Sequence, residues 1–251
     1  MKRSGWLAVL LCGGLAVWAV ADEPAGKPAT DKASKQVQAI GMVERLSGHY
    51  RLALTQIDLS ESSVTDDDLE ELAELTSLQE LNLHGTPITD LGVAYLNGLT
   101  GLESLFLDDT KITDIGAAHL ERLVRLEALY LDNTQIGDEG LKFIAGLVRL
   151  DDLSLSSTRV TDAGLANLKD LHALRQLSLA NTKIGDKGLA AIAGLDKLEE
   201  LALDGTAVSD HGLAQLESLK HLRELGVAGT RVTDAGIKRI QKALPKVKIG
   251  R

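Results

Sequence analysis

Several residue types that most enzymes and metal proteins rely on are scarce in this sequence. The 251 residues include one cysteine, Cys12, so no disulfide can form within the chain. The six histidines fall at unrelated places and lack the spacing of a zinc site. No Gly-x-Ser-x-Gly, His-Glu-x-x-His or phosphate-loop motif is present. We therefore expect no metal, no cofactor and no catalytic activity.

Aromatic residues and positive charge are scarce as well. Aromatics make up 3% of the chain, and both tryptophans, Trp6 and Trp18, lie near its start. Lysine and arginine together number 27 against 36 acidic residues, which gives a formal net charge of −9. A chain this acidic is repelled by phosphate backbones and anionic lipid surfaces. We expect no nucleic-acid partner.

The N-terminus has the three parts of an export signal. Lys2 and Arg3 form a basic start, residues 6–20 form an apolar run of 15, and residues 19–21 read Ala-Val-Ala, a small-x-small cleavage site. The run is shorter than the ~20 residues that a membrane-spanning helix needs. We predict that residues 1–21 are a cleaved signal peptide and that no stable membrane span remains.

Two alternatives to cleavage stay open. One is an uncleaved membrane anchor, and the other is a lipid anchor on Cys12, which the bulky Leu11 before it disfavours. Cleavage after Ala21 would leave a chain without cysteine or tryptophan and with a formal net charge of −11, since two lysine or arginine charges are removed and no acid.

A repeat of 24 residues fills most of the chain without insertion or deletion. Each unit reads L-x-x-L-x-L-x-x-T-x-[IV]-[TGS]-D-x-G-[LVAI]-x-x-[LI]-x-x-L. Eight units cover residues 54–245, and they start at residues 54, 78, 102, 126, 150, 174, 198 and 222. Positions below are counted from the first leucine of each unit.

The spacing within one unit predicts a strand followed by a helix. In the unit that starts at Leu126, leucines alternate at period two around Leu129 and Leu131, as in a strand with one buried face. Leu141 and Ile144 then follow at helical spacing. One unit cannot offset the ordering entropy of its residues, but a stack can. We predict an α/β solenoid with parallel strands on the concave face and short helices on the convex face.

Thr134, Asp138 and Gly140 recur in nearly every unit, and we interpret them as structural residues. The threonine is expected to hydrogen-bond in the turn after the strand. The residue before Asp138 caps the helix, and the aspartate lies in the first helical turn, where its charge favours the helix N-terminus. The glycine allows neighbouring units to approach closely. A ladder of calcium sites is the alternative, but calcium needs several oxygens per turn and the unit supplies one aspartate.

The repeat resembles leucine-rich repeats, most closely the T-D-x-G-L variety of eukaryotic F-box adaptors and of many exported bacterial proteins. The segments AIGMVERLSGHYRLALTQIDLSESSVTDDDL (39–69) and ALPKVKIGR (243–251) are similar to exported planctomycete proteins in particular. The resemblance covers about residues 40–251. It implies a horseshoe that binds another protein, and it does not name the partner.

The flanking segments are expected to complete the solenoid. Residues 22–35 are small, polar and proline-bearing, which predicts a flexible linker. Residues 36–53 predict an N-terminal capping helix, since apolar residues share one face. Residues 246–251 predict a final cap strand whose basic residues discourage edge-to-edge pairing.

The candidate binding residues lie at the exposed third, fifth, seventh and eighth positions, which line the concave face. Phe106 and Tyr130 occupy the fifth position of adjacent units, so they are expected to stand side by side in solvent. The polar residues expected around them are His84, Asp108, Asp109, Asp132 and Asp152. The predicted patch would dock a basic or amphipathic protein. Alternatively, the aromatic pair only stabilises the sheet.

These observations predict a non-catalytic protein-recognition module. It is expected to be a monomer that is exported to the periplasm, the cell surface or the medium. One alternative is the substrate-recognition subunit of a ubiquitin ligase, which the F-box resemblance suggests and the export signal opposes. Another is a structural envelope protein that binds itself or the cell wall.

Overall fold

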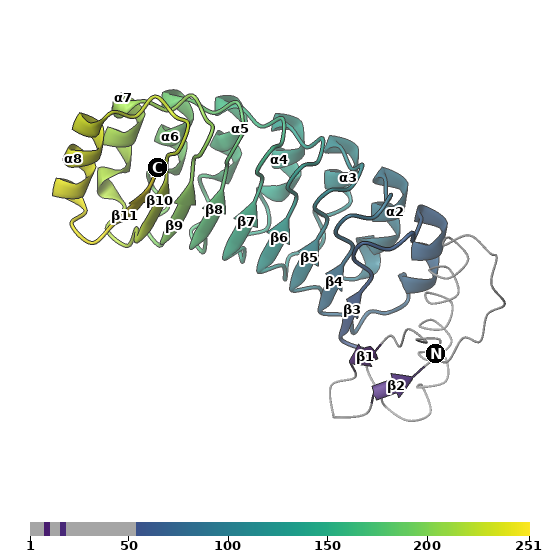
Figure 1. The fold of residues 1–251 in the computed structure, drawn as a ribbon. Helices are drawn as coiled ribbons and strands as arrows, with labels where there is room; N and C mark the ends of the chain where they lie inside the picture. The colour runs from purple at the N-terminus through teal and green to yellow at the C-terminus, as the bar shows by residue number, and fades with distance from the viewer. Residues whose placement is uncertain (1–7, 11–15, 19–53) are drawn as a thin grey trace, which may run out of the picture.

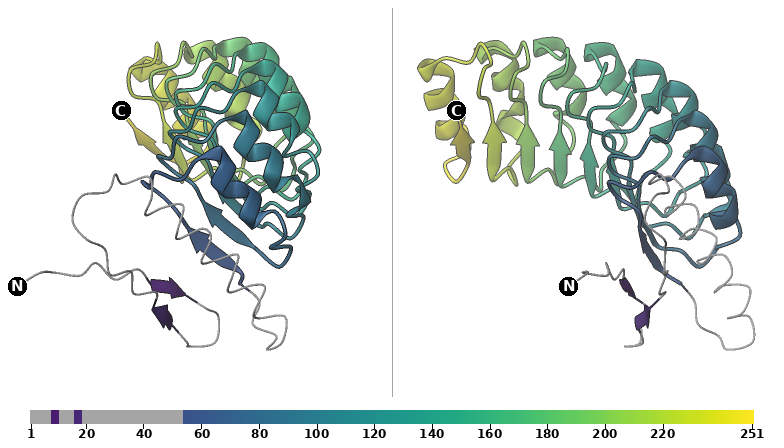
Figure 2. Two further views of the ribbon diagram at one scale, coloured as in Figure 1. Left: turned by 90° about the vertical axis from the view of Figure 1, so that its right-hand side faces the viewer. Right: turned by 45° about the vertical axis from the view of Figure 1, so that its right-hand side comes forward.

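The computed structural model describes residues 8–10, 16–18 and 54–251. Residues 54–251 form an arc in which one parallel sheet lines one side and short helices line the other (Figure 1). Figure 2 shows the same two layers from the end and from an oblique angle. The fold is therefore the predicted α/β solenoid.

The sheet has nine strands of three residues each, and every strand pairs in parallel with the strand that follows it in the chain. The strands are β3 (Gln56–Asp58), β4 (Glu80–Asn82), β5 (Ser104–Phe106), β6 (Ala128–Tyr130), β7 (Asp152–Ser154), β8 (Gln176–Ser178), β9 (Glu200–Ala202), β10 (Glu224–Gly226) and β11 (Lys248–Gly250). Paired residues differ by 24 in number, as in Leu105↔Leu129. Each concave position therefore lies beside the same position of the next unit.

The convex side consists of short α-helices and 3₁₀ turns. The helices are α2 (Asp90–Ala94), α3 (Asp114–Ala118), α4 (Asp138–Ile144), α5 (Asp162–Leu165), α6 (Asp186–Ile192), α7 (Asp210–Leu213) and α8 (Asp234–Ala243). The 3₁₀ segments are η1 (Asp66–Leu72), η2 (Tyr95–Gly98), η3 (Ala166–Leu168) and η4 (Ala214–Ser218). Most helices stop after one or two turns because the chain must return to the sheet within a 24-residue unit.

The apolar positions of each unit form one continuous core. In the unit that starts at Leu126, the residues with no exposed surface are Leu126, Leu129, Leu131, Ile136, Leu141, Ile144 and Leu147. Leu147 lies in the turn after α4 and still packs inward. Burying one large apolar side chain contributes about 1.5–3 kcal/mol of stability. This contribution is repeated along the stack and stabilises the solenoid.

Asp138 links its unit to the next one, and this contact was not expected. Its Oδ1 accepts a hydrogen bond from the Thr161 backbone N–H at 2.8 Å, and its Oδ2 accepts one from the Thr161 hydroxyl at 2.7 Å. The aspartate does lie in the first turn of α4, as expected from sequence. However, its carboxylate satisfies the cap of the following helix, α5, whose N-cap residue is Thr161.

The glycine two residues later makes room for the same kind of contact. A Cβ atom on Gly140 would lie 2.6 Å from Oδ1 of Asp114, which belongs to the preceding unit. That oxygen accepts hydrogen bonds from the backbone N–H groups of Gly137 at 2.6 Å and Gly140 at 3.0 Å. The recurring Asp-x-Gly therefore works across units, because the glycine of one unit accommodates the aspartate of the unit before it.

The recurring threonine acts within its own unit. The hydroxyl of Thr134 donates to the carbonyl oxygen of Leu131 at 2.6 Å, and the side chain is buried. The same bond is made at 2.6 Å by Thr86, Thr110, Thr182, Thr206 and Thr230. The bond satisfies the carbonyl of the buried residue that follows each strand from β4 to β10.

The structure describes the predicted C-terminal segment but not the predicted linker and N-terminal cap. β11 extends the sheet beyond β10 within the segment predicted as a final strand, residues 246–251. The linker predicted at 22–35 and the capping helix predicted at 36–53 lie outside the described residues. Within residues 1–21, β1 (Ala8–Leu10) pairs antiparallel with β2 (Ala16–Trp18). The cleaved signal peptide remains a prediction.

Candidate functional site

The concave face carries a stacked aromatic pair. Phe106 at the end of β5 is the register partner of Tyr130 at the end of β6. Their ring centroids are 4.7 Å apart and their planes differ by 2°. Both side chains are half-buried, since the fifth position faces away from the core and each ring covers the other. The two residues thus lie side by side, as the 24-residue spacing predicted.

Two predicted site residues, Asp108 and Asp132, accept hydrogen bonds from the backbone of the following unit. Oδ1 of Asp108 accepts from the Asp132 N–H at 2.9 Å. Oδ1 of Asp132 accepts from the Ser156 N–H at 2.6 Å and from the Ser154 hydroxyl at 2.5 Å. Burial raises the pKa of Asp108, the bond from the Asp132 N–H opposes that rise, and the Asp132 charge adds to it. These carboxylates therefore also hold adjacent units together.

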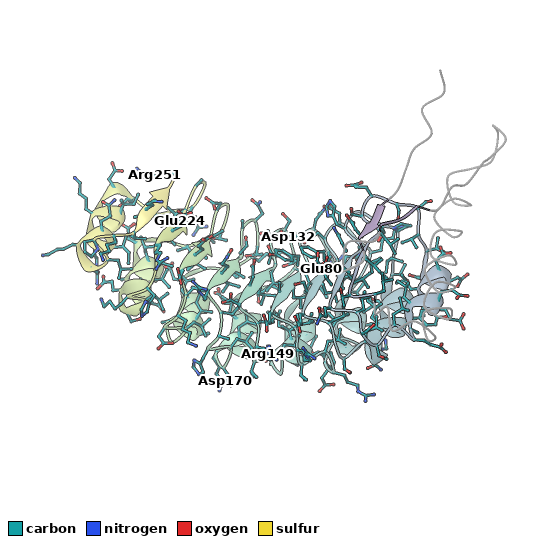
Figure 3. The ribbon with its side chains drawn as sticks, turned by 90° about the horizontal axis from the view of Figure 1, so that it is seen from below. Glu80, Asp132, Arg149, Asp170, Glu224 and Arg251 are labelled. Atoms are coloured by element: carbon teal, nitrogen blue, oxygen red, sulfur yellow. The ribbon has the colours of Figure 1, made fainter. Side chains whose placement is uncertain are left out.

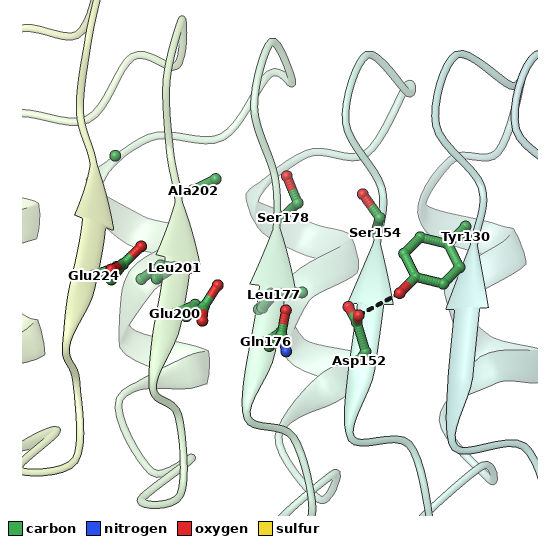
Figure 4. Close-up of a pocket in the computed structure, with 11 residues that line it drawn as sticks. Tyr130, Asp152, Ser154, Gln176, Leu177, Ser178, Glu200, Leu201, Ala202 and Glu224 are labelled. Atoms are coloured by element: carbon green, nitrogen blue, oxygen red, sulfur yellow. Dashed lines mark hydrogen bonds between the residues drawn. The ribbon is translucent and has the colours of Figure 1, made fainter. Parts of the chain in front are cut away.

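Asp152 touches the aromatic pair directly. Its Oδ2 accepts a hydrogen bond from the Tyr130 hydroxyl at 2.5 Å (Figure 4). Burial raises the pKa of Asp152, the Tyr130 bond lowers it in part, and the charges of Asp151 and Asp132 raise it. Burial first, and then the bond to Asp152, raise the pKa of Tyr130. A carboxylate in this position is poorly solvated, so a cation from a partner would stabilise its negative charge.

His84 lies on the other side of the aromatic pair, between two carboxylates. Its Nε2 is 3.2 Å from Oε1 of Glu61, and its Nδ1 is 3.7 Å from Oδ2 of Asp109. When the imidazole is protonated, it can bridge the two acids across three adjacent units. His84 and Asp109 were both predicted site residues, and the structure brings them together.

The eighth position, which includes Asp109, is restricted by the backbone. The non-glycine residues at this position have positive φ angles: Glu61 (53°), Asp109 (56°), Asn133 (55°), Ser157 (58°) and Asn181 (56°). The glycines there are Gly85, Gly205 and Gly229, with φ of 67°, 70° and 67°. Left-handed backbone favours glycine, asparagine and aspartate. The eighth position, which the sequence analysis counts among the exposed binding positions, is therefore also restricted by its backbone.

A groove of about 420 Å³ extends from Tyr130 along the concave face toward the C-terminus (Figure 4). Its lining residues are Tyr130, Asp152, Ser154, Gln176, Leu177, Ser178, Glu200, Leu201, Ala202, Glu224 and Gly226. The binding residues predicted from sequence lie only at its Tyr130–Asp152 end. The available signal was the run of small residues at the fifth position, from Ser154 to Gly226.

The positive charge of the repeats lies mainly away from this surface. In Figure 3, Glu80, Asp132 and Glu224 lie on the sheet, whereas Arg149 and Asp170 lie on the opposite margin. In β3–β10 and the two residues after each strand, the third, fifth and seventh positions carry no lysine or arginine. The acids at these positions are Asp58, Glu80, Asp108, Asp132, Asp152, Glu200, Asp204 and Glu224. The outward positions of the concave surface are therefore acidic overall from β3 to β10.

Two further findings concern residues 54–251 and the short strands β1 and β2. Within these described parts of the chain, no group of three or more histidine, cysteine or acidic residues is arranged to hold a metal ion. No helix among them is long and apolar enough to cross a membrane.

Family models match two stretches of the chain. A model described as Leucine rich repeat matches residues 76–136, and a second one, also described as Leucine Rich repeat, matches residues 171–193. These two stretches are leucine-rich repeats. A search of curated proteins finds no match. The exported bacterial variety within these repeats remains a resemblance.

Solved leucine-rich-repeat structures share the fold. Internalin C2 of Listeria monocytogenes aligns with a TM-score of 0.69 at 24% identity, covering 91% of this chain and all of that one. A leucine-rich-repeat protein of Leptospira interrogans aligns with a TM-score of 0.53 at 20% identity, covering 80% of this chain and 61% of that one.

A plant receptor ectodomain also aligns. The structure is that of GASSHO1/SCHENGEN3 from Arabidopsis thaliana in complex with CASPARIAN STRIP INTEGRITY FACTOR 2. Its TM-score is 0.53 at 18% identity, and the alignment covers 73% of this chain and 25% of that one. At these identities the likeness concerns the fold.

Proposed function

We propose that this leucine-rich-repeat protein recognises a basic or amphipathic protein through its concave face and performs no chemistry on it. The observation that carries the proposal is the half-buried Phe106–Tyr130 stack beside carboxylates on a face without lysine or arginine at its outward positions. Stacked aromatics bordered by polar groups are typical of binding hot spots. The acidic surroundings favour a positively charged partner.

The fold supports this assignment in general terms. One protein of this fold is solved as a membrane receptor kinase ectodomain in complex with CASPARIAN STRIP INTEGRITY FACTOR 2. Together with internalin C2, it is also consistent with a role outside the cytoplasm. We propose that this chain, as a monomer, is exported by the predicted signal at residues 1–21 and acts in the periplasm, at the cell surface or in the medium.

A pull-down from an envelope extract tests the proposal. The bait is the full chain held through a C-terminal tag, compared with the double variant Phe106→Ala/Tyr130→Ala. The control variant is Leu91→Ala/Ile115→Ala, which removes an equally apolar pair from the helix side of adjacent units, where these residues are 72% and 68% exposed. Circular dichroism first confirms that all three proteins are folded.

The expected result is a protein captured by the wild type and the control variant and lost from the concave variant. Loss only from the control variant would assign binding to the helix side and contradict the proposal. Equal capture by all three proteins, or capture by none, would also contradict it. The remaining function would then be structural, and concentration-dependent self-association in sedimentation would identify it.

A further inference from the structure

We propose that the groove between Tyr130 and Gly226 binds an extended segment of the partner that carries two basic residues three positions apart. This inference rests on the proposed function and specifies the chemistry of its partner. It depends on the shape of the groove floor, on two carboxylates without a cation, and on the distance between the strands that carry them.

The floor of the groove admits a polypeptide backbone. The fifth positions of β7 to β10 are Ser154, Ser178, Ala202 and Gly226. These side chains are short, whereas the fifth positions of β5 and β6 carry the aromatic stack. Tyr130 therefore stands at one end of the groove, and short side chains line it beyond that residue (Figure 4). Small residues at successive positions allow a partner main chain to lie close to the sheet.

The edge of the groove carries carboxylates at the third position. Figure 4 shows Asp152, Gln176 and Glu200 in one row toward the starts of β7, β8 and β9. Glu224 continues the row on β10, but the Lys248 ammonium nitrogen lies 3.1 Å from its Oε1. The Lys248 pair thus neutralises the far end, which leaves Asp152 and Glu200 as the two acids facing the groove.

The nearest arginines are engaged by a different row of acids. At the second position, Arg175 pairs with Glu199 at 2.5 Å and approaches Asp151 at 3.9 Å, and Arg223 pairs with Glu199 at 2.8 Å. Among the described residues, neither Asp152 nor Glu200 forms an ion pair. The solenoid therefore neutralises the acids beside the groove and leaves the acids in it available to an external cation.

The strand spacing determines which basic segment fits. Asp152 and Glu200 occupy equivalent positions two strands apart in a parallel sheet. Strands lie about 4.8 Å apart, so the two carboxylates are separated by about 9.6 Å along the groove. An extended polyproline-type chain rises about 3.1 Å per residue and returns to the same face every third residue, which places residues i and i+3 about 9.3 Å apart.

Other spacings fit less well. Residues i and i+2 of a β-strand share a face at about 6.7 Å, which is too short for the two carboxylates. An α-helix could place residues i and i+7 about 10.5 Å apart, but it is about 10–12 Å wide with its side chains. A groove with a floor of small residues suits the slimmer, extended chain. The side chain of Gln176, between the two acids, can hydrogen-bond the backbone of that extended chain.

Synthetic peptides test the inference directly by fluorescence anisotropy with the full chain. The first probe is a proline-rich peptide with two lysines separated by two residues. The second has the same composition with adjacent lysines, and the third is an alanine-rich helix with lysines seven residues apart. The variants are Glu200→Gln in the groove and Glu80→Gln in the same row on β4. Glu80 accepts a hydrogen bond from Gln56 at 3.1 Å and lies outside the groove.

We expect the spaced extended probe to bind most tightly. Glu200→Gln should weaken it about three- to fivefold, as expected for losing one exposed charge pair. The same substitution should abolish the preference over the adjacent-lysine probe. Glu80→Gln should change neither. Both glutamine variants keep the size of the side chain they replace, so equal far-UV circular dichroism is expected.

Four results would overturn the inference. Equal affinity for the spaced and adjacent probes, or equal weakening by Glu80→Gln, would mean that only diffuse negative charge attracts the peptide. Tightest binding of the helical probe would assign the groove to a helix. Self-association of the free protein that Glu200→Gln abolishes would assign the groove to a second copy of the chain.

These outcomes are separable from failure of the proposed function. A natural partner that is captured by the wild type and by Glu200→Gln, and lost with Phe106→Ala/Tyr130→Ala, would uphold concave-face recognition and refute the basic-segment inference. Selective binding of the spaced probe together with unchanged capture by the aromatic variant would uphold the basic-segment inference and refute the part assigned to the Phe106–Tyr130 stack.

Discussion

Replacing Gly140 by alanine should destabilise the protein, although the same change in most helices is stabilising. Gly140 lies in the first half of α4, where alanine is favoured over glycine by about 1 kcal/mol. The added methyl group would lie 2.6 Å from Oδ1 of Asp114, so that carboxylate must move. Its hydrogen bonds to the N–H groups of Gly137 and Gly140 would then be lost.

The magnitude follows from these two bonds. A hydrogen bond to a charged group contributes about 1.5–3 kcal/mol, and the half-exposed Asp114 places each bond near the lower end. Losing both costs about 3 kcal/mol, and the helix preference of alanine returns about 1 kcal/mol. We expect a net loss of about 2 kcal/mol in the free energy of unfolding, measured by urea denaturation followed by far-UV circular dichroism.

A double-mutant cycle separates this explanation from a general intolerance of side chains at position 140. In an Asp114→Ala background the obstructing carboxylate is gone, and the new methyl group meets only Ile136 at 3.2 Å and Ala117 at 3.3 Å, so Gly140→Ala should cost much less than in the wild type. Gly146→Ala is the matched control, since no atom lies within 4 Å of the place its new methyl group would take, and its effect should stay within about 0.5 kcal/mol. Additive losses from Asp114→Ala and Gly140→Ala would refute the cross-unit coupling.

Three further predictions concern single sites. Asp152→Asn should raise the melting temperature at neutral pH and weaken the binding of a cationic probe. Burial raises the folded-state pKa of Asp152 above its unfolded value, so ionisation of this carboxyl destabilises the fold. The gain in melting temperature should disappear as the pH falls below about 3.9, where the carboxyl is protonated in the unfolded state as well. A gain that persists at low pH would contradict this. Ser157→Gly should stabilise the protein by up to about 1 kcal/mol in urea denaturation, because φ is 58° and glycine removes the left-handed strain; destabilisation would show that the serine side chain matters more. Thr158→Val should cost about 1 kcal/mol, because the buried Leu155 carbonyl loses a hydroxyl donor at 2.7 Å, and an unchanged unfolding midpoint would mean that this carbonyl finds another donor.

The sequence predicted much of this solenoid because the repeat carries local information. Leucines at the first, fourth and sixth positions, as at Leu126, Leu129 and Leu131, determine which face of each strand is buried. The 24-residue period without insertion then aligns equivalent residues of neighbouring units, which brings Phe106 onto Tyr130. The Thr134 bond to Leu131 spans three residues and was also foreseeable from turn chemistry.

The tertiary structure alone decided how side chains of different units share their hydrogen bonds and charges. The sequence places Asp138 at a helix start, but only the stacking of units directs its carboxylate to Thr161, 23 residues later. The same stacking commits Asp108 and Asp132 to neighbouring backbone groups, directs Tyr130 to Asp152 and leaves Glu200 facing a groove. The 24-residue period determines which positions are neighbours. The distance and direction between their atoms depend on the curvature and packing of the whole stack.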